Sequence, residues 1–293
     1  MNRHKAGFVN IIGNPNVGKS TLMNALMGEK LSIITNKAQT TRHRILGILN
    51  GEDYQVVFSD TPGIIKPAYQ LQESMMDFVK SAFQDADVLL YMVEIGEKDL
   101  KDEAFFKKIT STKIPVLLLL NKVDLSNQEQ LEAQVALWHQ KVPNAEIFPV
   151  SALEKFNIQA VLDRILELLP ESPPFFPKDQ FTDKPERFFV NEAIREKILV
   201  NYKKEIPYAV EVDTEEFKEE EDIIRIRSVI MVERDTQKGI IIGHKGSALK
   251  RVGTQAREDL EKFFNKKIHL ELYVKVNKDW RSNKNQLKRF GYN

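Results

Sequence analysis

Near the start of the chain, two glycines, a lysine and a serine stand at a spacing suited to holding phosphate groups. They follow the pattern G-x-x-x-x-G-K-S, and the residues expected to contact phosphate there are Gly13, Asn14, Pro15, Asn16, Val17, Gly18, Lys19, Ser20 and Thr21. Glycines let backbone N–H groups converge on phosphate oxygens beside the positive end of a helix. We expect Lys19 to neutralise the outer phosphates and the Ser20 hydroxyl to bind Mg²⁺.

A second polar segment follows an apolar run that ends at Ser59. Its residues, also assigned to the phosphates, are Asp60, Thr61, Pro62, Gly63 and Ile64. Asp60 is expected to hold Mg²⁺ through water, and the Gly63 amide to contact the γ-phosphate, so the segment would respond to hydrolysis. Many GTPases place a glutamine after this glycine to orient the attacking water. Because Ile64 cannot form such a hydrogen bond, we predict slow intrinsic hydrolysis.

Three further polar residues near the phosphate site each have two interpretations. Thr41 is the predicted switch ligand of Mg²⁺, with Thr40 as the alternative. Asn16 is a candidate ligand for K⁺, although a loop-stabilising asparagine explains it equally well. His43 is interpreted as a surface histidine rather than a general base.

The segment Asn121-Lys122-Val123-Asp124 follows the apolar run 116–120. A buried Asp124 carboxylate can accept from both the ring N–H and the exocyclic amine of guanine, whereas adenine would leave it unpaired. Asn121 is expected to link the base to neighbouring loops, and the Lys122 stem to cover the ring. Alone, such a segment is usually a solvated turn; behind a phosphate loop it predicts guanine recognition. Backbone N–H groups after the next apolar run should meet the guanine oxygen, from Ser151, Ala152 and Leu153.

Residues 8–169 alternate short apolar runs with amphipathic stretches. The predicted strands are 8–12, 44–49, 55–59, 88–93, 116–120 and 146–150, and helices are expected from about residues 19, 72, 101, 128 and 157. This alternation predicts an α/β P-loop domain with a mostly parallel sheet and helices on both faces. We assign residues 1–170 to this domain. The prolines of residues 171–187 then mark a linker, whose phenylalanines indicate that it packs against the protein.

Residues 188–280 have a different order: a helix over 186–201, strands over 209–217 and 222–233, a turn region, a helix to about 265 and a strand over 267–276. Period-two alternation in the last strand predicts a sheet covered on one face. This order is typical of an α+β type II KH domain, and a G-x-x-G segment precedes the second long helix. Glycines there let a nucleic-acid backbone approach closely. The predicted RNA-binding residues are Ile242, Gly243, His244, Lys245, Gly246, Lys250 and Arg251.

Residues 281–293 form a predicted basic tail. Trp280 and Phe290 stand among the basic residues that begin at Lys278, and they are expected either to stack on bases or to belong to a solvated end.

Bulk composition excludes several classes of protein. The 293 residues include no cysteine, which excludes disulfides and thiolate metal sites, and fits a reducing cytoplasm. The apolar runs are far shorter than a transmembrane helix, and the first residues do not resemble a signal peptide. The net charge is only +1, so a nucleic-acid surface must arise from uneven placement of charge.

Taken in order, the segments 13–20, 39–43, 60–63, 121–124, 151–153 and 243–246 resemble the Era family of bacterial GTPases, over nearly the whole chain. The resemblance implies Mg²⁺ with GTP or GDP as cofactor and binding to the 3′ region of 16S ribosomal RNA. It also implies a role in assembly of the 30S ribosomal subunit, and a cytoplasmic protein with peripheral association with the inner membrane.

Two other functions are consistent with part of the sequence. A membrane-associated signalling GTPase could use the basic residues 278–289 to contact lipid or protein. An ATP-dependent phosphotransferase would share the phosphate loop, but Asp124 argues against it.

Overall fold

The computed structural model describes residues 4–292, so the first three residues of the segment tested for a signal peptide, and Asn293 at the end of the predicted tail, lie outside it. The described chain divides into two compact units. One comprises residues 4–68 and 72–183, and the other comprises residues 69–71 and 184–292.

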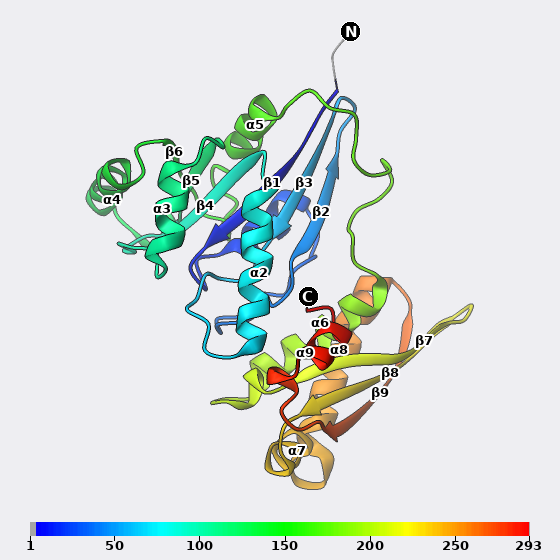
Figure 1. Cartoon of the computed structure of the whole chain (residues 1–293). Coiled ribbons are helices and arrows are strands. Elements are labelled where there is room, and N and C mark those ends of the chain that lie inside the picture. The colour runs from blue at the N-terminus through cyan, green and yellow to red at the C-terminus, as the bar shows by residue number, and fades with distance from the viewer. Residues whose placement is uncertain (1–3, 293) are drawn as a thin grey trace. The chain divides into compact units, whose positions relative to one another are not determined.

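The first unit contains a six-stranded sheet of order β2-β3-β1-β4-β5-β6 (Figure 1). Its strands are β1 (Lys5–Gly13), β2 (Ile45–Asn50), β3 (Tyr54–Asp60), β4 (Val88–Glu94), β5 (Val116–Asn121) and β6 (Ala145–Pro149). Only β2 is antiparallel to its neighbour. The register pairs Ile11 with Asp60, and Glu94 with Asn121, so the polar residues that end these strands collect at one edge.

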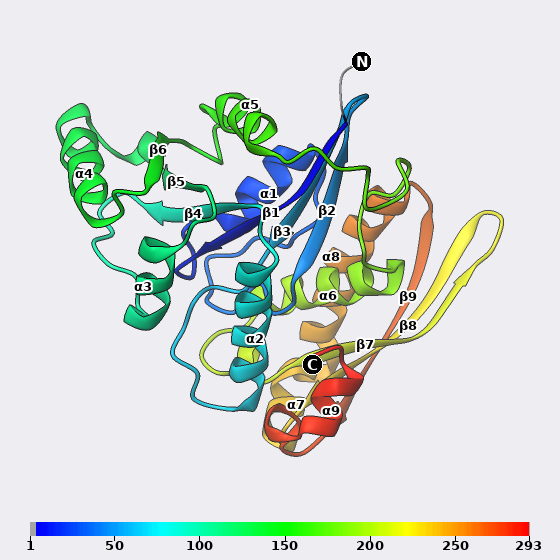
Figure 2. The same ribbon diagram turned by 45° about the horizontal axis from the view of Figure 1, so that its top comes forward.

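Helices cover both faces of this sheet, as right-handed crossovers require (Figures 1 and 2). Helices α1 (Lys19–Met27) and α5 (Ile158–Leu168) lie on one face, and α2 (Gln70–Gln84), α3 (Glu103–Ser111) and α4 (Gln128–Lys141) lie on the other. Strands β4 and β5, which are interior strands of the sheet, are almost continuously buried, which explains their apolar sequences. The predicted α/β architecture is confirmed.

The proline-rich segment 171–183 is extended and hydrogen-bonds to the edge of this sheet. The Ile48 N–H donates to the Phe181 carbonyl at 2.9 Å, and the Leu46 N–H donates to the Asp183 carboxylate at 3.0 Å. Phe175 packs its ring 5.1 Å from that of Phe8. The segment therefore shields the edge strand β2, because its prolines favour an extended backbone without continuing a helix.

The second unit contains a three-stranded sheet of order β7-β8-β9, in which β7 and β8 are antiparallel and β8 and β9 are parallel. Its elements are α6 (Glu186–Asn201), β7 (Glu211–Glu219), β8 (Ile223–Val232), α7 (Asp235–Ile242), α8 (Ser247–Phe264), β9 (Lys267–Val276) and α9 (Lys284–Arg289). Apolar side chains of α6, α8 and one sheet face form a single core. In β9, Ile268 and Val274 are buried while Lys267 and His269 are exposed, so the predicted one-sided sheet is confirmed.

Two parts of this unit differ from expectation. The predicted turn region after β8 contains the helix α7, which the three consecutive isoleucines at 240–242 had concealed because they lack a helical period. The predicted basic tail folds into a 3₁₀ turn (Trp280–Ser282) and α9.

Candidate functional site

The phosphate loop between β1 and α1 depends on glycine at the position of closest packing. Gly18 has φ +104°, and a Cβ there would lie 2.3 Å from the amide nitrogen of Asn121. Gly63 approaches from the segment after β3, where a Cβ would lie 2.7 Å from the Pro15 backbone. Both contacts explain why no side chain can replace the glycine hydrogen without moving a neighbouring loop.

Lys19 is buried in this loop, and its ammonium donates to the Asn14 carbonyl at 2.8 Å and the Gly13 carbonyl at 3.2 Å. Burial lowers the pKa of Lys19 to about 8, while the nearby Asp60 and Glu97 carboxylates oppose that shift. The ammonium is therefore held by neutral carbonyls, which phosphate oxygens can replace.

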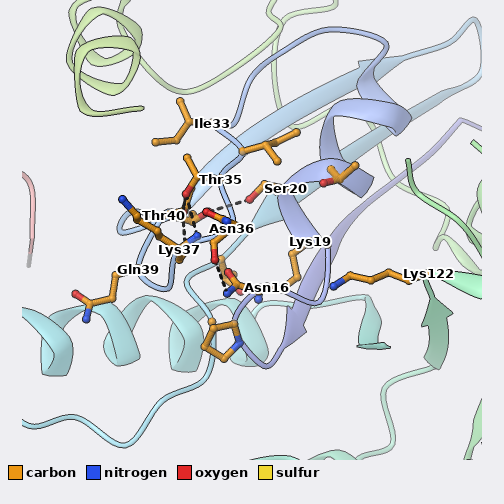
Figure 3. Close-up of a pocket in the computed structure, with 17 residues that line it drawn as sticks. Asn16, Lys19, Ser20, Ile33, Thr35, Asn36, Lys37, Gln39, Thr40 and Lys122 are labelled. Carbon is orange, nitrogen blue, oxygen red and sulfur yellow. Dashed lines mark hydrogen bonds between the residues drawn. The ribbon is translucent and has the colours of Figure 1, made fainter. Parts of the chain in front are cut away.

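Three side-chain oxygens converge beside Lys19. The Ser20 hydroxyl, which lies beside Lys19 in Figure 3, donates to Asp60 Oδ2 at 2.7 Å and lies 2.9 Å from Thr41 Oγ1. Burial raises the pKa of Asp60, and the hydrogen bond from Ser20 opposes that shift. Within the described residues, Asp60 Oδ1 accepts no hydrogen bond although it is buried. Oxygen ligands and an unsatisfied carboxylate fit a hard cation such as Mg²⁺.

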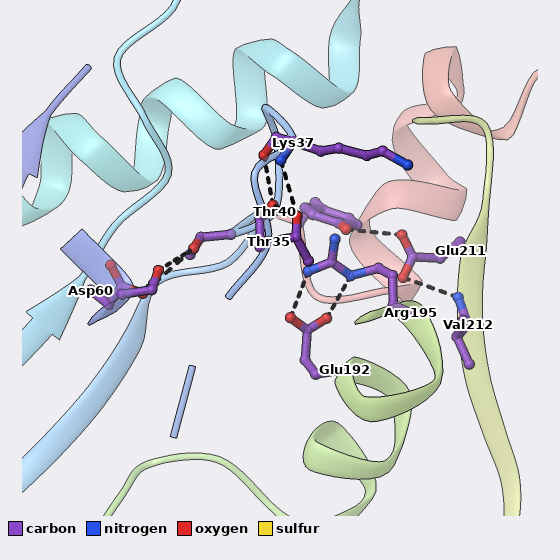
Figure 4. Close-up of polar contacts among 11 residues, drawn as sticks. Thr35, Lys37, Thr40, Asp60, Glu192, Arg195, Glu211 and Val212 are labelled. Carbon is purple, nitrogen blue, oxygen red and sulfur yellow. Dashed lines mark hydrogen bonds and ion pairs between the residues drawn. The ribbon is translucent and has the colours of Figure 1, made fainter. Parts of the chain in front are cut away.

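The two candidate threonines differ in their contacts. The Thr40 hydroxyl donates to the Lys37 carbonyl at 2.6 Å and lies 2.6 Å from Thr35 Oγ1 (Figure 4). Thr41 instead faces Ser20, so the geometry favours Thr41 as the residue nearer the cation position.

Lys19, Ser20, Thr40 and Thr41 line a cavity of ≈ 330 Å³ (Figure 3). Predicted residues that line it are Pro15, Asn16, Gly18, Lys19, Ser20, Thr21, Thr40, Thr41, Thr61, Gly63 and Lys122. The cavity is also lined by residues that were not predicted from the sequence: Ile33, Ile34, Thr35, Asn36, Lys37 and Gln39. They precede the predicted switch threonines, and that adjacency was the only signal in the sequence.

Several residues assigned to the phosphates do not line the cavity: Gly13, Asn14, Val17, Asp60, Pro62 and Ile64. The Ile64 side chain is only 1% exposed, and its N–H donates to the Gly13 carbonyl at 3.0 Å. The Thr61 hydroxyl, although Thr61 lines the cavity, donates to the Ile11 carbonyl at 2.6 Å. The geometry thus assigns Ile64 and the Thr61 hydroxyl to supporting the loop rather than to touching phosphate.

Asn121 connects the phosphate loop to the predicted base-recognising loop. Its amide donates to the Val17 carbonyl at 2.7 Å, and its Oδ1 accepts from the Ala152 N–H at 2.9 Å. Ser151 N–H donates to the Phe156 carbonyl at 3.3 Å. Of the three N–H groups expected to meet guanine, only that of Leu153 has no partner among the described residues. Asn121 therefore links the loops as predicted, and the Ala152 N–H, which was expected to meet guanine, bonds to Asn121 instead.

The other two residues of this segment lie closer to solvent. Lys122 is half-buried and pairs with Glu94, whereas Asp124 is exposed and not buried as expected. Lys122, two residues before it, has a left-handed backbone conformation. The Asp124 carboxylate is accessible to a base.

Asn16 and His43 have structural contacts. The Asn16 amide nitrogen donates to the Asn36 carbonyl at 3.1 Å, the loop-stabilising contact considered above. His43 packs 5.9 Å from the Phe78 ring and does not line the cavity.

In the second unit, the G-x-x-G loop joins α7 to α8 through a tight turn. Gly243 has φ +71°, and a Cβ there would lie 2.6 Å from the Ala248 Cβ, whereas a Cβ on Gly246 (φ +78°) would face open space. His244 and Lys245 are exposed at the tip. Gly243 is therefore required by packing, while Gly246 leaves room for a ligand to approach the backbone.

A groove of ≈ 370 Å³ runs from this loop between α8 and β9. It is lined by Gly246, Leu249, Lys250, Gly253, Thr254, Arg257, Leu270 and Leu272. The predictions included only Gly246 and Lys250 of these residues. The sequence signal for Leu249, Gly253, Thr254 and Arg257 was their helical spacing around Lys250. Apolar walls with two cations at the edge suit unpaired bases joined by phosphates.

Two of the predicted RNA-binding residues lie outside this groove. Arg251 does not line it and lies near the Tyr202 phenol, whose pKa is raised by burial while the Arg251 charge opposes that shift. Ile242 is half-buried against the core, and Ile240 is the exposed isoleucine of α7. Both differences follow from the helical geometry of α7 and α8.

The stacking prediction for Trp280 is wrong. Its ring is fully buried, and its N–H donates to the Ala209 carbonyl at 3.0 Å. Phe290 packs edge-on against it, with ring centroids 5.9 Å apart. The segment 280–292 therefore belongs to the core of the second unit, where Tyr292 O–H also donates to buried Glu211 at 2.9 Å.

Among residues 4–292, no helix has the length and apolar character needed to cross a membrane.

Residues 8–122 match the family described as 50S ribosome-binding GTPase, and residues 205–281 match the KH domain. Over its whole length the chain is 44% identical to GTPase Era of Staphylococcus haemolyticus (strain JCSC1435), covering 98% of that protein. The chain belongs to the Era family of GTPases. Era of Staphylococcus epidermidis is 43% identical, with the same coverage.

Two solved Era structures match the fold at 39% sequence identity and a TM-score of 0.94. One is Era in complex with MgGDPNP and nucleotides 1506–1542 of 16S ribosomal RNA, covering 99% of each chain. The other is a variant of Aquifex aeolicus Era bound to GDP and AlF4⁻, covering 98% of this chain and 99% of that one. The chain is accordingly an Era-family GTPase with a C-terminal KH domain, and the predicted fold and enzyme class are confirmed.

Proposed function

We propose that this GTPase is a nucleotide-controlled switch that binds 16S ribosomal RNA and acts in assembly of the small ribosomal subunit. The observation that carries the proposal is the groove beside Gly246, which presents Lys250 and Arg257 on a unit fused to a nucleotide site. The similarity to Era bound to an RNA fragment supports the choice of RNA.

In the nucleotide site, Mg²⁺ would be held by Ser20 and Thr41 directly and by Asp60 through water. The cation supplies positive charge to the phosphates as negative charge develops on the leaving oxygen. Lys19 would exchange its carbonyl partners for the β- and γ-phosphates, and Asp124 would pair with guanine. Because Ile64 points into the core, hydrolysis has no side chain after Gly63 to orient water, and a slow intrinsic rate follows.

A potassium ion forms a second element of the proposal. Asn16 lines the cavity, and its amide nitrogen donates to the Asn36 carbonyl, which fixes the side chain. The amide oxygen is the atom of Asn16 that would bind K⁺. GTP hydrolysis measured at equal ionic strength in KCl and NaCl tests this element. Equal rates in the two salts would remove K⁺ from it.

The path from the nucleotide to the linker is continuous within the first unit. The loop containing Thr41 leads directly into β2, and β2 hydrogen-bonds to the linker at Phe181 and Asp183. We propose that ordering of Thr41 by GTP is transmitted along β2 to the linker. A ligand can shift RNA affinity only if the two nucleotide states differ in their contacts.

The decisive experiment measures binding of a 3′-terminal 16S RNA fragment with GDPNP and with GDP, for the wild type and for Gly243→Asp/Gly246→Asp. Tighter binding with GDPNP, lost in the double variant, supports the proposed switch. Equal affinity in both nucleotide states removes the coupling, and RNA binding unaffected by the double variant moves the RNA site away from this loop.

The cytoplasmic location and peripheral membrane association rest on the family resemblance, whereas the alternative of a signalling GTPase rests on the basic residues 278–289. The tail packs against the KH unit through buried Trp280 and Leu287, while its basic residues Lys284, Lys288 and Arg289 are exposed. Competition between the RNA fragment and anionic vesicles separates these functions, because vesicles displace RNA only if the two share a surface.

A further inference from the structure

The loop after β4 touches the phosphate loop at a residue that no nucleotide contact explains. The Glu97 carboxylate accepts hydrogen bonds from the Asn14 side-chain amide and, at 3.0 Å, from the Glu94 N–H. Glu97 does not line the nucleotide cavity, so it cannot act by touching the phosphates.

Asn14 is buried and uses both its side chain and its backbone. Its amide also donates to the Asp99 carbonyl at 3.1 Å, and its Oδ1 accepts from the Lys101 N–H at 3.2 Å. Its backbone carbonyl accepts from the Lys19 ammonium at 2.8 Å. One residue thus joins the loop after β4 to the lysine that meets the phosphates.

The same loop reaches the guanine-binding segment at its other end. Glu94 pairs with Lys122, and the Ile95 N–H donates to the Asn121 carbonyl at 3.0 Å. Glu97 holds the Glu94 backbone from one side, so a single carboxylate connects the contacts of Asn14 with those of Lys122.

We propose that Glu97 is a positioning residue for nucleotide binding. It fixes Asn14, and thereby the carbonyl that orients Lys19, and it keeps the phosphate loop and the Asn121–Lys122 segment at the spacing that one nucleotide must bridge. A pre-set spacing raises affinity because the loops need not be ordered when the ligand binds. Glu97 acts on binding of GTP and GDP alike and not on the hydrolysis step.

The test compares Glu97→Ala with Glu97→Gln by displacement of a fluorescent GDP analogue and by steady-state GTP hydrolysis. For Glu97→Ala, Kd for GDP and KM for GTP should rise about tenfold while kcat changes less than about twofold. Glu97→Gln should restore part of the affinity, because its amide oxygen can still accept from Asn14 while its NH2 group cannot accept from the Glu94 N–H. A purely structural carboxylate would not show this separation of KM from kcat together with rescue.

Asp99→Ala is the matched control, because it removes a carboxylate from the same loop whose side chain pairs with Lys141 and does not contact Asn14. Its affinity should equal that of the wild type. The proposal would be overturned if Asp99→Ala and Glu97→Ala lost GDP affinity equally, or if Glu97→Gln bound GDP as weakly as Glu97→Ala. The charge of the loop, and not the contact with Asn14, would then explain the effect.

A double-mutant cycle with Asn14→Ala checks the route of action, and the Asn14→Ala single variant tests the link if Glu97→Ala does not fold. If Glu97 acts through Asn14, the double variant binds GDP no more weakly than the weaker single variant. Independent, additive losses would show that Asn14 is not the link, and unchanged GDP affinity in Asn14→Ala would overturn the proposal directly.

Discussion

The nucleotide site of the first unit and the groove of the KH unit both bring glycine backbone to a place where phosphate can approach, but they hold their polar side chains differently. Lys19, Ser20 and Asn121 are tied by hydrogen bonds to other parts of the protein. Lys245 and Lys250, by contrast, project into solvent from a loop and a helix. The first site is preorganised by buried polar contacts, and the second is preorganised mainly by its backbone.

This difference predicts how each site responds to mutation. In a buried network, removal of one partner leaves another group unsatisfied, which costs about 1–3 kcal/mol. At an exposed groove each cation contributes a smaller, salt-dependent increment. We therefore expect large, coupled effects on nucleotide binding and small, additive effects on RNA binding.

The largest effect should come from Gly18→Ala. The new methyl group must displace the Asn121 amide at 2.3 Å in a backbone conformation that disfavours side chains, so GDP affinity should fall roughly 100-fold, or about 3 kcal/mol. Titration calorimetry with GDP measures it. Gly28→Ala is the control, because its φ is also positive (+73°) but its Cβ meets nothing within 4 Å. Equal GDP affinity in Gly18→Ala and wild type would contradict the model of a preorganised loop.

Asn121→Ala should have the next largest effect. It leaves the Val17 carbonyl and the Ala152 N–H without their shared partner, so GDP affinity should fall by about 2 kcal/mol, roughly 30-fold. RNA affinity of the nucleotide-free variant, measured by filter binding, should match that of the wild type. A parallel loss of RNA affinity would indicate general unfolding instead.

Lys250→Ala and Arg257→Ala should each weaken RNA binding only several-fold and lower the slope of log K against log salt by about 0.7, as loss of one phosphate contact on a single strand requires. Arg251→Ala removes the same charge from the same helix outside the groove and should leave the slope unchanged. A salt titration from 50 to 200 mM distinguishes them. Identical slopes for Lys250→Ala and Arg251→Ala would mean that the groove does not define the contact surface.

The smallest effect should come from Gly253→Ala, in the middle of α8. Alanine favours the helix by about 0.5–1 kcal/mol, while its Cβ would lie 3.3 Å from Leu272 Cδ1 across the groove. Thermal stability should therefore rise while RNA affinity falls by about twofold. A rise in thermal stability together with a fall in RNA affinity would show that the new methyl group narrows the groove and does not destabilise the fold. A gain in both stability and RNA affinity would contradict the assignment of the groove.

The sequence predicted the strands of both units well, because each buried strand is a short apolar run and β9 alternates with period two. It missed α7, whose apolar residues are consecutive rather than spaced by turns. It also placed Trp280 at the surface, since basic neighbours in sequence do not show that the ring reaches the Ala209 carbonyl, 71 residues away.

The phosphate loop was predictable because its pattern fixes local backbone geometry. The contribution of residues 33–37 and the exposure of Asp124 were not, since both depend on how separate loops fold over the cavity. Asn14 illustrates the same limit: its place in the pattern indicated phosphate, but its side chain is committed to a loop more than 80 residues later.

The contact of Tyr292 with Glu211, together with the burial of Trp280 and Leu287, bears on how the protein is made. During synthesis, β7 emerges long before the segment that covers it, so the KH unit cannot complete its core on the ribosome until residues up to 292 have left the exit tunnel. The first unit has no such requirement, since its sheet and linker are complete by residue 183. A nascent chain would therefore hold a finished nucleotide site before it holds a finished RNA groove.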